Sequence, residues 1–342
     1  MLQLANQTPF SAALSVLPDT QGIESAYAVV KATFALTDTD LVLAEQQLPL
    51  LAADVFWGDP VTTGLRAVGE FALPKPATDV LLVARAVAEH ADTRVLDVSL
   101  RVGPLQKTVR VFGNRRWERA GDGWLPTPPE PFERLPLRWE FAFGGCATAT
   151  DGAPPDYEPR NPVGRGFIGR EEKALAGRSL PNLEDPRQLI RSPADRPPPA
   201  CFAPIAPTWA PRKAYVGTYD ETWQQQRAPY LPHDFDSRYF QVAPADQIAP
   251  GFLVGGEPVE IRGCSLGDAI RFALPICSLE LEFDFDGAHL PVAPKLETVL
   301  LEPDKGRVQL LWRAGIAVDK RLLKLREVIV YCREYPRQPA QA

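Results

Sequence analysis

The segment Ser278-Leu-Glu-Leu-Glu-Phe-Asp-Phe-Asp286 decides the fold class, because apolar and acidic side chains alternate along it with a period of two. Successive side chains of a β-strand point to opposite faces of a sheet, so this pattern predicts a strand with one buried face. The segment runs into Asp286-Gly287, a dipeptide typical of a tight hairpin turn. We therefore expect an antiparallel hairpin here.

The polar face of this strand carries four carboxylates, Glu280, Glu282, Asp284 and Asp286. Carboxylates spaced two residues apart repel one another, and such a row is able to bind a cation or a basic partner. A sheet face exposed to solvent explains the same pattern. The sequence leaves both interpretations open.

Similar β-type runs lie toward both ends of the chain, at Tyr27–Phe34, Asp79–Arg85, Thr93–Val102, Thr108–Phe112, Thr298–Glu302, Arg307–Trp312 and Glu327–Cys332. Helix signals are few and are confined to Glu171–Ala176 and Asp319–Leu325. These patterns predict a mainly β protein with sandwich-like sheets from the N- and C-terminal flanks. The flanks form either one sheet system or two separate sandwiches.

Proline sets the middle of the chain apart, with 22 of the 36 prolines between residues 119 and 250. Proline removes a backbone donor and fixes φ, which disfavours helices and central strands there. The same segment contains Trp124, Trp139, Trp209 and Trp223, whose large rings require burial. We expect one folded unit, residues 1–342, with an N-terminal β region (1–118), an ordered but irregular centre (119–250) and a C-terminal β region (251–342).

Charge and cysteine content argue against some classes of partner and predict where in the cell the protein lies. The formal net charge is -6, without a dense block of Lys and Arg, which argues against a nucleic-acid partner. Neither a signal peptide nor a membrane-spanning apolar run is expected. Five widely spaced cysteines, Cys146, Cys201, Cys264, Cys277 and Cys332, predict reduced, mostly buried thiols and hence a cytoplasmic protein.

Two short motifs resemble those of enzymes but lack their context. Gly164-Arg-Gly-Phe-Ile-Gly169 matches a dinucleotide-binding pattern, yet no strand precedes it. Gly263-Cys-Ser-Leu-Gly267 matches a nucleophile elbow, yet β-type segments flank it on both sides. We interpret both as turns and expect no cofactor and no catalytic residue.

The three histidines do not predict a metal site, because His90, His233 and His289 are far apart in the sequence. The segment His233-Asp234-Phe-Asp236 contains nitrogen and oxygen donors. A polar turn, in which the Asp carboxylates cap backbone N–H groups, is the favoured interpretation.

The centre of the chain contains a series of short motifs, and their order is specific enough to compare with known families. It includes Arg138-Trp-Glu-Phe-Ala-Phe-Gly-Gly145, Asn161-Pro-Val-Gly-Arg-Gly-Phe167, Pro181-Asn-Leu-Glu184, Phe202-Ala-Pro-Ile205, Gly217-Thr-Tyr-Asp220, Arg238-Tyr-Phe240 and Gly255-Gly-Glu257. With Val111-Phe-Gly-Asn-Arg115 upstream, the series resembles the family called domain of unknown function 2169, found with type VI secretion loci. The resemblance implies a non-catalytic adaptor or chaperone that brings a toxic effector to a PAAR-type spike-tip protein.

Aromatic and arginine side chains of the central loops are the expected partner contacts, because such residues dominate protein interfaces. The candidates are Trp209, Arg212, Trp223, Arg227, Arg238 and Tyr239. The alternative for each is a structural role that fixes the loops to the sheets. No nucleic-acid or membrane partner is expected.

Two other functions stay open. A β-scaffold hydrolase would use the carboxylates of Asp220, Asp234 and Asp236 across a cleft. A structural component of the secretion apparatus would form a permanent complex.

Overall fold

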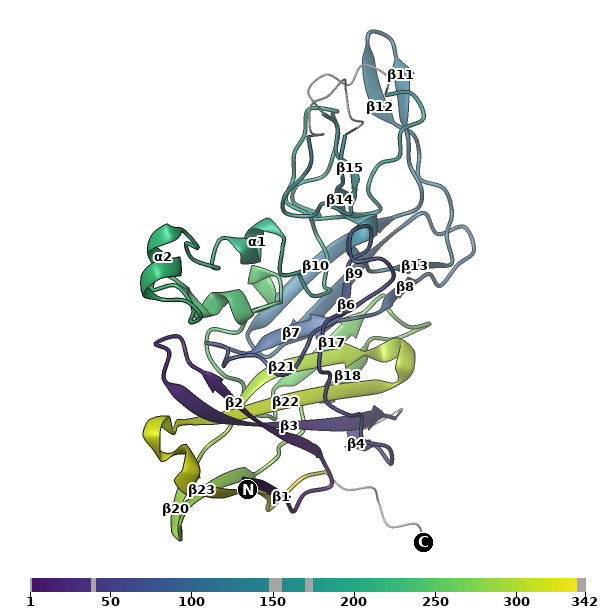
Figure 1. The fold of residues 1–342 in the computed structure, drawn as a ribbon. Coiled ribbons are helices and arrows are strands. Elements are labelled where there is room, and N and C mark those ends of the chain that lie inside the picture. Colours follow the sequence, from purple (N-terminus) through teal and green to yellow (C-terminus); the bar gives the residue numbers. More distant parts are fainter. Residues whose placement is uncertain (1, 38–40, 148–155, 170–174, 337–342) are drawn as a thin grey trace, which may run out of the picture.

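A computed structural model describes residues 2–37, 41–147, 156–169 and 175–336, and in it the protein is mainly β. The largest sheet has the order β2-β3-β22-β21-β7, with β4 paired to the end of β3 (Figure 1). Its strands are β2 (Ser11–Pro18), β3 (Glu24–Leu36), β4 (Leu41–Leu43), β7 (Asp79–Leu82), β21 (Lys295–Glu302) and β22 (Arg307–Ala317). Within the described strands of this sheet, β7 and β21 are the one parallel pair.

Two further sheets complete the framework. One has the antiparallel order β16-β10-β9-β17-β18: β9 (Val95–Val102), β10 (Leu105–Phe112), β16 (Leu183–Glu184), β17 (Pro258–Arg262) and β18 (Ile270–Ala273). The other has the order β1-β23-β19-β20: β1 (Gln3–Asn6), β19 (Leu279–Phe285), β20 (Ala288–Val292) and β23 (Leu325–Cys332). Each large sheet contains strands from both flanks, so neither flank forms a sandwich of its own.

Short pairs of strands and a few helices build the rest. The pairs are β5 (Val55–Phe56) with β6 (Leu65–Ala67), β8 (Arg85–Val87) with β13 (Arg134–Pro136), β11 (Trp117–Ala120) with β12 (Gly123–Pro126), and β14 (Phe143–Gly144) with β15 (Arg165–Gly166). The α-helices are α1 (Ala210–Lys213) and α2 (Glu221–Gln226). Single 3-10 turns are Trp139–Phe141, Ser237–Phe240, Ala245–Gln247 and Pro303–Lys305, and Asp319–Lys324 forms a longer one.

The β-type runs identified in the sequence overlap strands of the structure. Ser278–Asp286 contains β19, and Asp286 turns the chain into β20 with φ of 52°. The run Asp79–Arg85 is not one strand, because β7 ends at Leu82 and β8 begins at Arg85. The helix expected at Asp319–Leu325 is a 3-10 helix, and most of the one expected at Glu171–Ala176 lies outside the described residues.

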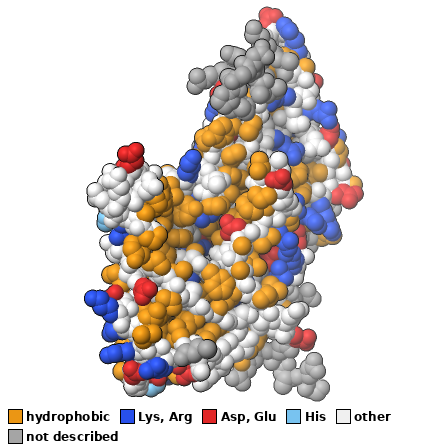
Figure 2. Space-filling view, viewed as in Figure 1, with side chains coloured by type: hydrophobic (Ala, Val, Ile, Leu, Met, Phe, Trp, Pro, Cys, Tyr) orange, Lys and Arg blue, Asp and Glu red, His pale blue; other side chains and the backbone are white. Residues whose placement is uncertain are grey.

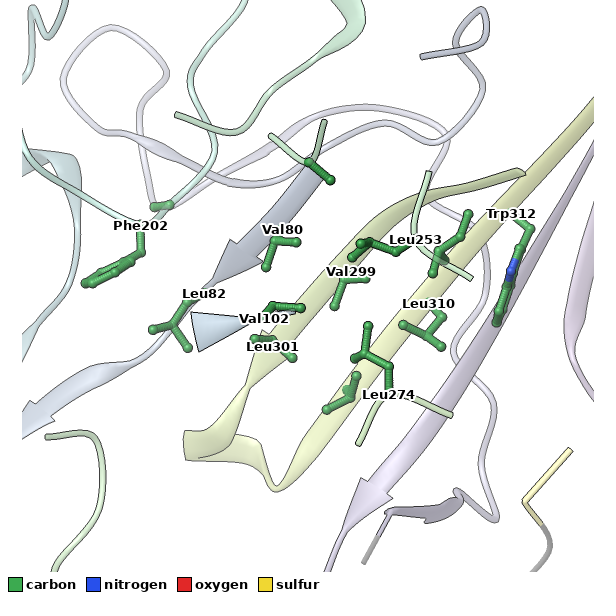
Figure 3. Packing of buried hydrophobic residues seen from close by; sticks show 14 of the residues in the cluster. Val80, Leu82, Val102, Phe202, Leu253, Leu274, Val299, Leu301, Leu310 and Trp312 are labelled. Carbon is green, nitrogen blue, oxygen red and sulfur yellow. The ribbon is translucent and has the colours of Figure 1, made fainter. Parts of the chain in front are cut away.

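One hydrophobic cluster spans the three large sheets and extends into the proline-rich centre. Alternation along the strands directs Val80, Val299 and Leu310 to the same face, where they meet Leu253 and Leu274 from outside that sheet (Figure 3). Phe202 and Trp139 of the centre belong to the same cluster. The central loops are therefore part of the core.

Around β14 the backbone segments approach one another closely. The Asn161 side chain is buried, and its Nδ2 donates to the carbonyl oxygens of Trp139 (2.8 Å) and Phe143 (3.0 Å). Gly144 has φ of 151°, and a Cβ atom there would lie 2.1 Å from the Asn161 carbonyl oxygen. The family-like motifs at 138–145 and 161–167 thus fix each other in space.

Candidate functional site

The six-stranded sheet has a second face, on the side opposite the core, where charged and polar side chains lie among apolar ones. Period-two alternation directs Lys31 and Thr33 of β3 to this face, and their register partners on β22 are Leu311 and Gln309. Arg313 follows two residues further along β22 and is 4% exposed. Charged groups buried at a sheet require partners, so other segments must cover this face.

A strap formed by residues 47–70 covers one part of the face. The Gln47 side chain bonds to both the N–H and the carbonyl of Thr33 at 2.8 Å, in the manner of a neighbouring strand. Lys31 Nζ lies 2.7 Å from Glu70 Oε2, which also accepts the Leu51 N–H at 2.7 Å. Burial raises the pKa of the Glu70 carboxyl above its ordinary value, although Lys31 acts in the opposite direction.

The second wall comes from the centre of the chain. Arg212 of α1 donates from Nε to the Tyr239 carbonyl (2.9 Å) and from Nη1 to the Ile205 carbonyl (3.0 Å). The Val242 N–H donates to Asp79 Oδ2 of β7 at 2.8 Å. Between the strap, the sheet and this wall lies a cleft of about 600 Å³, which we call the basic cleft. It has the volume of a small-molecule or peptide site.

Ion pairs order the floor of the basic cleft. Glu297 is 1% exposed, and it accepts from Arg313 Nε at 2.8 Å and from the Lys75 N–H at 2.9 Å. Lys75 Nζ lies 2.7 Å from Asp79 Oδ2. These pairs connect β7, β21 and β22, and they fix the charged side chains in place.

At the rim, Glu302 accepts from Lys305 Nζ (2.7 Å) and Arg307 Nε (2.6 Å). Burial alone would raise the pKa of Glu302, but these hydrogen bonds outweigh burial and lower it below 4.5. A lowered folded-state pKa stabilises the fold above the unfolded-state pKa, and this stabilisation is lost as the pH falls through the folded-state pKa.

We expect Glu302→Gln to be less stable than the wild type at neutral pH, with the difference shrinking as the pH falls below about 4.5. Urea unfolding of both proteins across this range measures the difference. A difference that stays constant with pH would contradict the ionised state of Glu302.

An aromatic lobe, residues 214–240, adjoins the basic cleft and includes α2 at the edge of the molecule (Figure 1). Asp220 caps α2 by accepting the Trp223 N–H at 2.8 Å. The rings of Tyr219 and Trp223 meet edge-to-face at 4.6 Å, and Tyr219 is 49% exposed. Hydrophobic side chains gather beside and below this lobe in Figure 2.

Arg227 fixes the aromatic lobe to the turn between β2 and β3. Its Nη2 donates to the Thr20 carbonyl (3.0 Å) and its Nε to the Leu231 carbonyl (2.8 Å). A Cβ atom at Gly22 would lie 3.1 Å from the Tyr230 ring, so this turn packs closely on the lobe. The lobe is therefore positioned by contacts distant in sequence.

The six partner candidates lie in one continuous segment but differ in exposure. Trp209 is 4% exposed and packs edge-to-face on Trp139 at 5.6 Å, while Arg212 is 6% exposed. These two side chains are fixed inside the wall, where Arg212 also lines the basic cleft. Trp223, Arg227, Arg238 and Tyr239 belong to the lobe, and Arg238 is exposed.

The three carboxylates considered for a hydrolase each accept a hydrogen bond from a backbone N–H group. Asp234 accepts from the Thr218 N–H (3.0 Å) and hydroxyl (2.7 Å), which lowers its pKa. Asp236 accepts from the Arg238 N–H (2.8 Å) and Nε (2.9 Å). Asp220 caps α2 in the same way. The local cap expected for a polar turn at His233–Asp236 is confirmed for Asp236, whereas Asp234 caps Thr218, 16 residues away in the sequence.

The enzyme-like motifs also lie in loops. Arg165–Gly166 pairs only with Phe143–Gly144, and no helix is described within Gly164–Gly169. Ser265 sits between β17 and β18, where its hydroxyl donates to the Asp268 carbonyl at 3.2 Å. Among the residues that the structure describes, no three His, Cys, Asp or Glu side chains are grouped to hold a metal.

All five cysteines are free, but the prediction that most are buried is wrong. Cys201 and Cys264 are buried, which raises the pKa of each thiol to about 12. Cys277 and Cys332 are half-buried, and Cys146 is exposed. The buried Cys201 and Cys264 lie in loops, as the half-buried Cys277 does, so the packing around each position decides exposure, and cysteine spacing does not encode it.

The acidic side chains of β19 and of the turn after it are paired with neighbouring groups. Arg333 lies 2.8 Å from Glu280, and His289 lies 2.9 Å from Glu282. Asp284 accepts the Gly287 N–H at 2.6 Å, and Arg326 pairs with Asp286. Neighbouring basic groups and the hairpin turn thus offset the repulsion within this row.

Sequence reasoning identified Arg212 and Tyr239, which line the basic cleft, but missed its other charged residues. A signal was present, because Lys31 interrupts the apolar run Tyr27–Phe34, and Gln309 and Arg313 do the same in β22. A charged residue within a buried strand indicates a buried partner. Glu70 lies 39 residues from Lys31, on the strap, and Glu297 lies 16 residues from Arg313, at an irregular position of the neighbouring strand, so the sequence alone did not connect them.

Residues 21–313 match the model of a family described as "Uncharacterized protein conserved in bacteria (DUF2169)". The chain belongs to the DUF2169 family. This match includes the strap, the wall of the basic cleft and the aromatic lobe, so these features lie within the DUF2169 region.

No curated protein and no solved structure matches the chain. Within the described part of this DUF2169 protein, no helix is long and apolar enough to cross a bilayer.

Proposed function

We propose that the chain is a non-catalytic adaptor of type VI secretion. It binds a toxic effector in the bacterial cytoplasm and helps to load it onto a PAAR-type spike-tip protein. The observation that carries the proposal is the aromatic lobe, in which Tyr219 and Tyr230 are exposed and Trp223 is half-buried, and which reaches the large cleft through Tyr239 and Phe240. Aromatic side chains on an ordered support are typical of binding hot spots.

The ordered backbone of the aromatic lobe supports binding without a large loss of entropy. Asp220, Asp234 and Arg227 all bond to main-chain or hydroxyl groups of the lobe or its neighbours. A partner would therefore meet a preformed surface, and a preformed surface binds more tightly than a loop that must first become ordered. The same bonds occupy the carboxylates that a hydrolase would need, which favours the adaptor.

Co-purification tests this function. The tagged chain is co-expressed with the products of the genes beside its own and purified in low salt, and the retained proteins are examined for a toxin and a PAAR-type tip protein. We expect the toxin, the tip protein or both to be retained. Retention of neither would overturn the proposal, and release of the chain from the cell with the spike would favour a structural component instead.

A further inference from the structure

The basic cleft has the build of a ligand site in its own right, independent of the adaptor function. Its lining is largely apolar, and it includes Leu48, Leu51, Val68, Pro204, Phe240 and Leu300. Apolar walls with a few convergent polar groups are typical of sites for small organic molecules and peptide segments.

Basic groups outnumber acidic ones in this cleft, although the chain as a whole is acidic. The basic lining residues are Lys31, Arg66, Lys75, Arg212, Lys305, Arg307 and Arg313, and the acidic ones are Asp54, Glu70 and Glu302. Asp79 and Glu297, paired with Lys75 and Arg313, supply two more negative charges. Seven basic groups against five acidic ones leave an excess of two positive charges.

Two lining arginines, Arg66 and Arg212, form no ion pair within the described residues. On the acidic side Asp54 is unpaired there too, and Glu302 is shared by two cations, so the excess stays at two. Arg212 donates only to carbonyl oxygens, and the desolvation of its guanidinium lowers the pKa of this side chain. Arg66 has its guanidinium 5.3 Å from the Trp57 ring centroid. An anion placed between apolar walls would gain from both charges.

Arg313 lies at the floor of the basic cleft. Its side chain is 4% exposed, and among the described residues its Nη1 has no hydrogen-bond partner. This nitrogen has less than 1 Å² of exposed surface, so it lies behind the surface of the cleft, and Arg66 and Arg212 are the guanidinium groups left to meet a ligand.

We propose that the basic cleft binds an organic carboxylate with an apolar body. The arginine fork matches the planar carboxylate, and the apolar walls take the rest of the ligand. The carboxylate belongs either to a free small acid or to the end of a peptide segment.

Isothermal titration with matched probes tests the inference. One pair is octanoate and 1-octanol, and the other is acetyl-Leu-Ala-Phe with a free carboxylate and the same peptide as its amide. We expect the charged member of at least one pair to bind about tenfold more tightly than the neutral member. The pair that shows the preference identifies the source of the carboxylate.

Variants of cleft residues distinguish binding in the basic cleft from binding elsewhere on the protein. Asp54→Asn keeps an acceptor for the Gly69 N–H but removes a negative charge, so affinity for the charged probe should rise about fivefold. Arg66→Gln should lower it by a similar factor, and Arg271→Gln on the distant β18 should leave it unchanged. Equal binding of charged and neutral probes, or affinities unmoved by Asp54→Asn and Arg66→Gln, would overturn the inference.

Discussion

Glu297→Ala should lower the free energy of unfolding by about 3–5 kcal/mol, the range found when one partner of a buried ion pair is removed. The variant leaves the buried Arg313 guanidinium without a carboxylate, and the Lys75 N–H loses its acceptor. Urea unfolding followed by tryptophan fluorescence measures the loss.

Glu260→Ala is the matched control. Glu260 likewise accepts two hydrogen bonds, here from the side chains of Arg262 and Arg271 at 2.7 Å each. These pairs lie in solvent, where ion pairs contribute little, so stability should be almost unchanged. A loss for Glu297→Ala no larger than that for Glu260→Ala would show that the floor of the basic cleft does not hold the sheet together.

The double variant Tyr219→Ala, Trp223→Ala should weaken binding of the toxin or tip protein by about 2–4 kcal/mol, roughly 30- to 1,000-fold. It removes the edge-to-face pair that the aromatic lobe presents to solvent. Surface-immobilised wild-type and variant chains are compared with the same soluble partner.

Tyr157→Ala is the control for exposed aromatic area, because Tyr157 is 52% exposed and lies outside the lobe. It should keep wild-type affinity. If both variants bind as the wild type does, the lobe is not the contact surface. An unchanged urea midpoint for the double variant shows that a loss of binding does not result from unfolding.

Much of the fold could be predicted from local pattern. Alternation at Ser278–Asp286 and the Asp286-Gly287 turn identified β19 and its hairpin, because period-two burial is a local property. The pairing order could not be predicted in this way. Neighbours such as β3 and β22 are separated by most of the chain, and only packing of their apolar faces brings them together.

The candidate functional residues, like the strands, could be predicted only where the signal is local in the sequence. Aromatic composition led to the segment that contains Trp209, Trp223 and Tyr239. It did not distinguish the buried Trp209 from the lobe residue Trp223, since exposure depends on the neighbouring Trp139. The basic cleft was missed because its ion pairs join segments such as Lys31 with Glu70 and Arg313 with Glu297.

Hydrogen–deuterium exchange of the chain, alone and with its co-purified partner, tests the proposed binding surface most directly. Slower exchange on binding is expected in residues 214–240 and in the adjoining strap, residues 47–70, with no change in the β11–β12 hairpin or in β20. Protection confined to β11–β12, β20 or the acidic face of β19, with the aromatic lobe unchanged, would contradict the account.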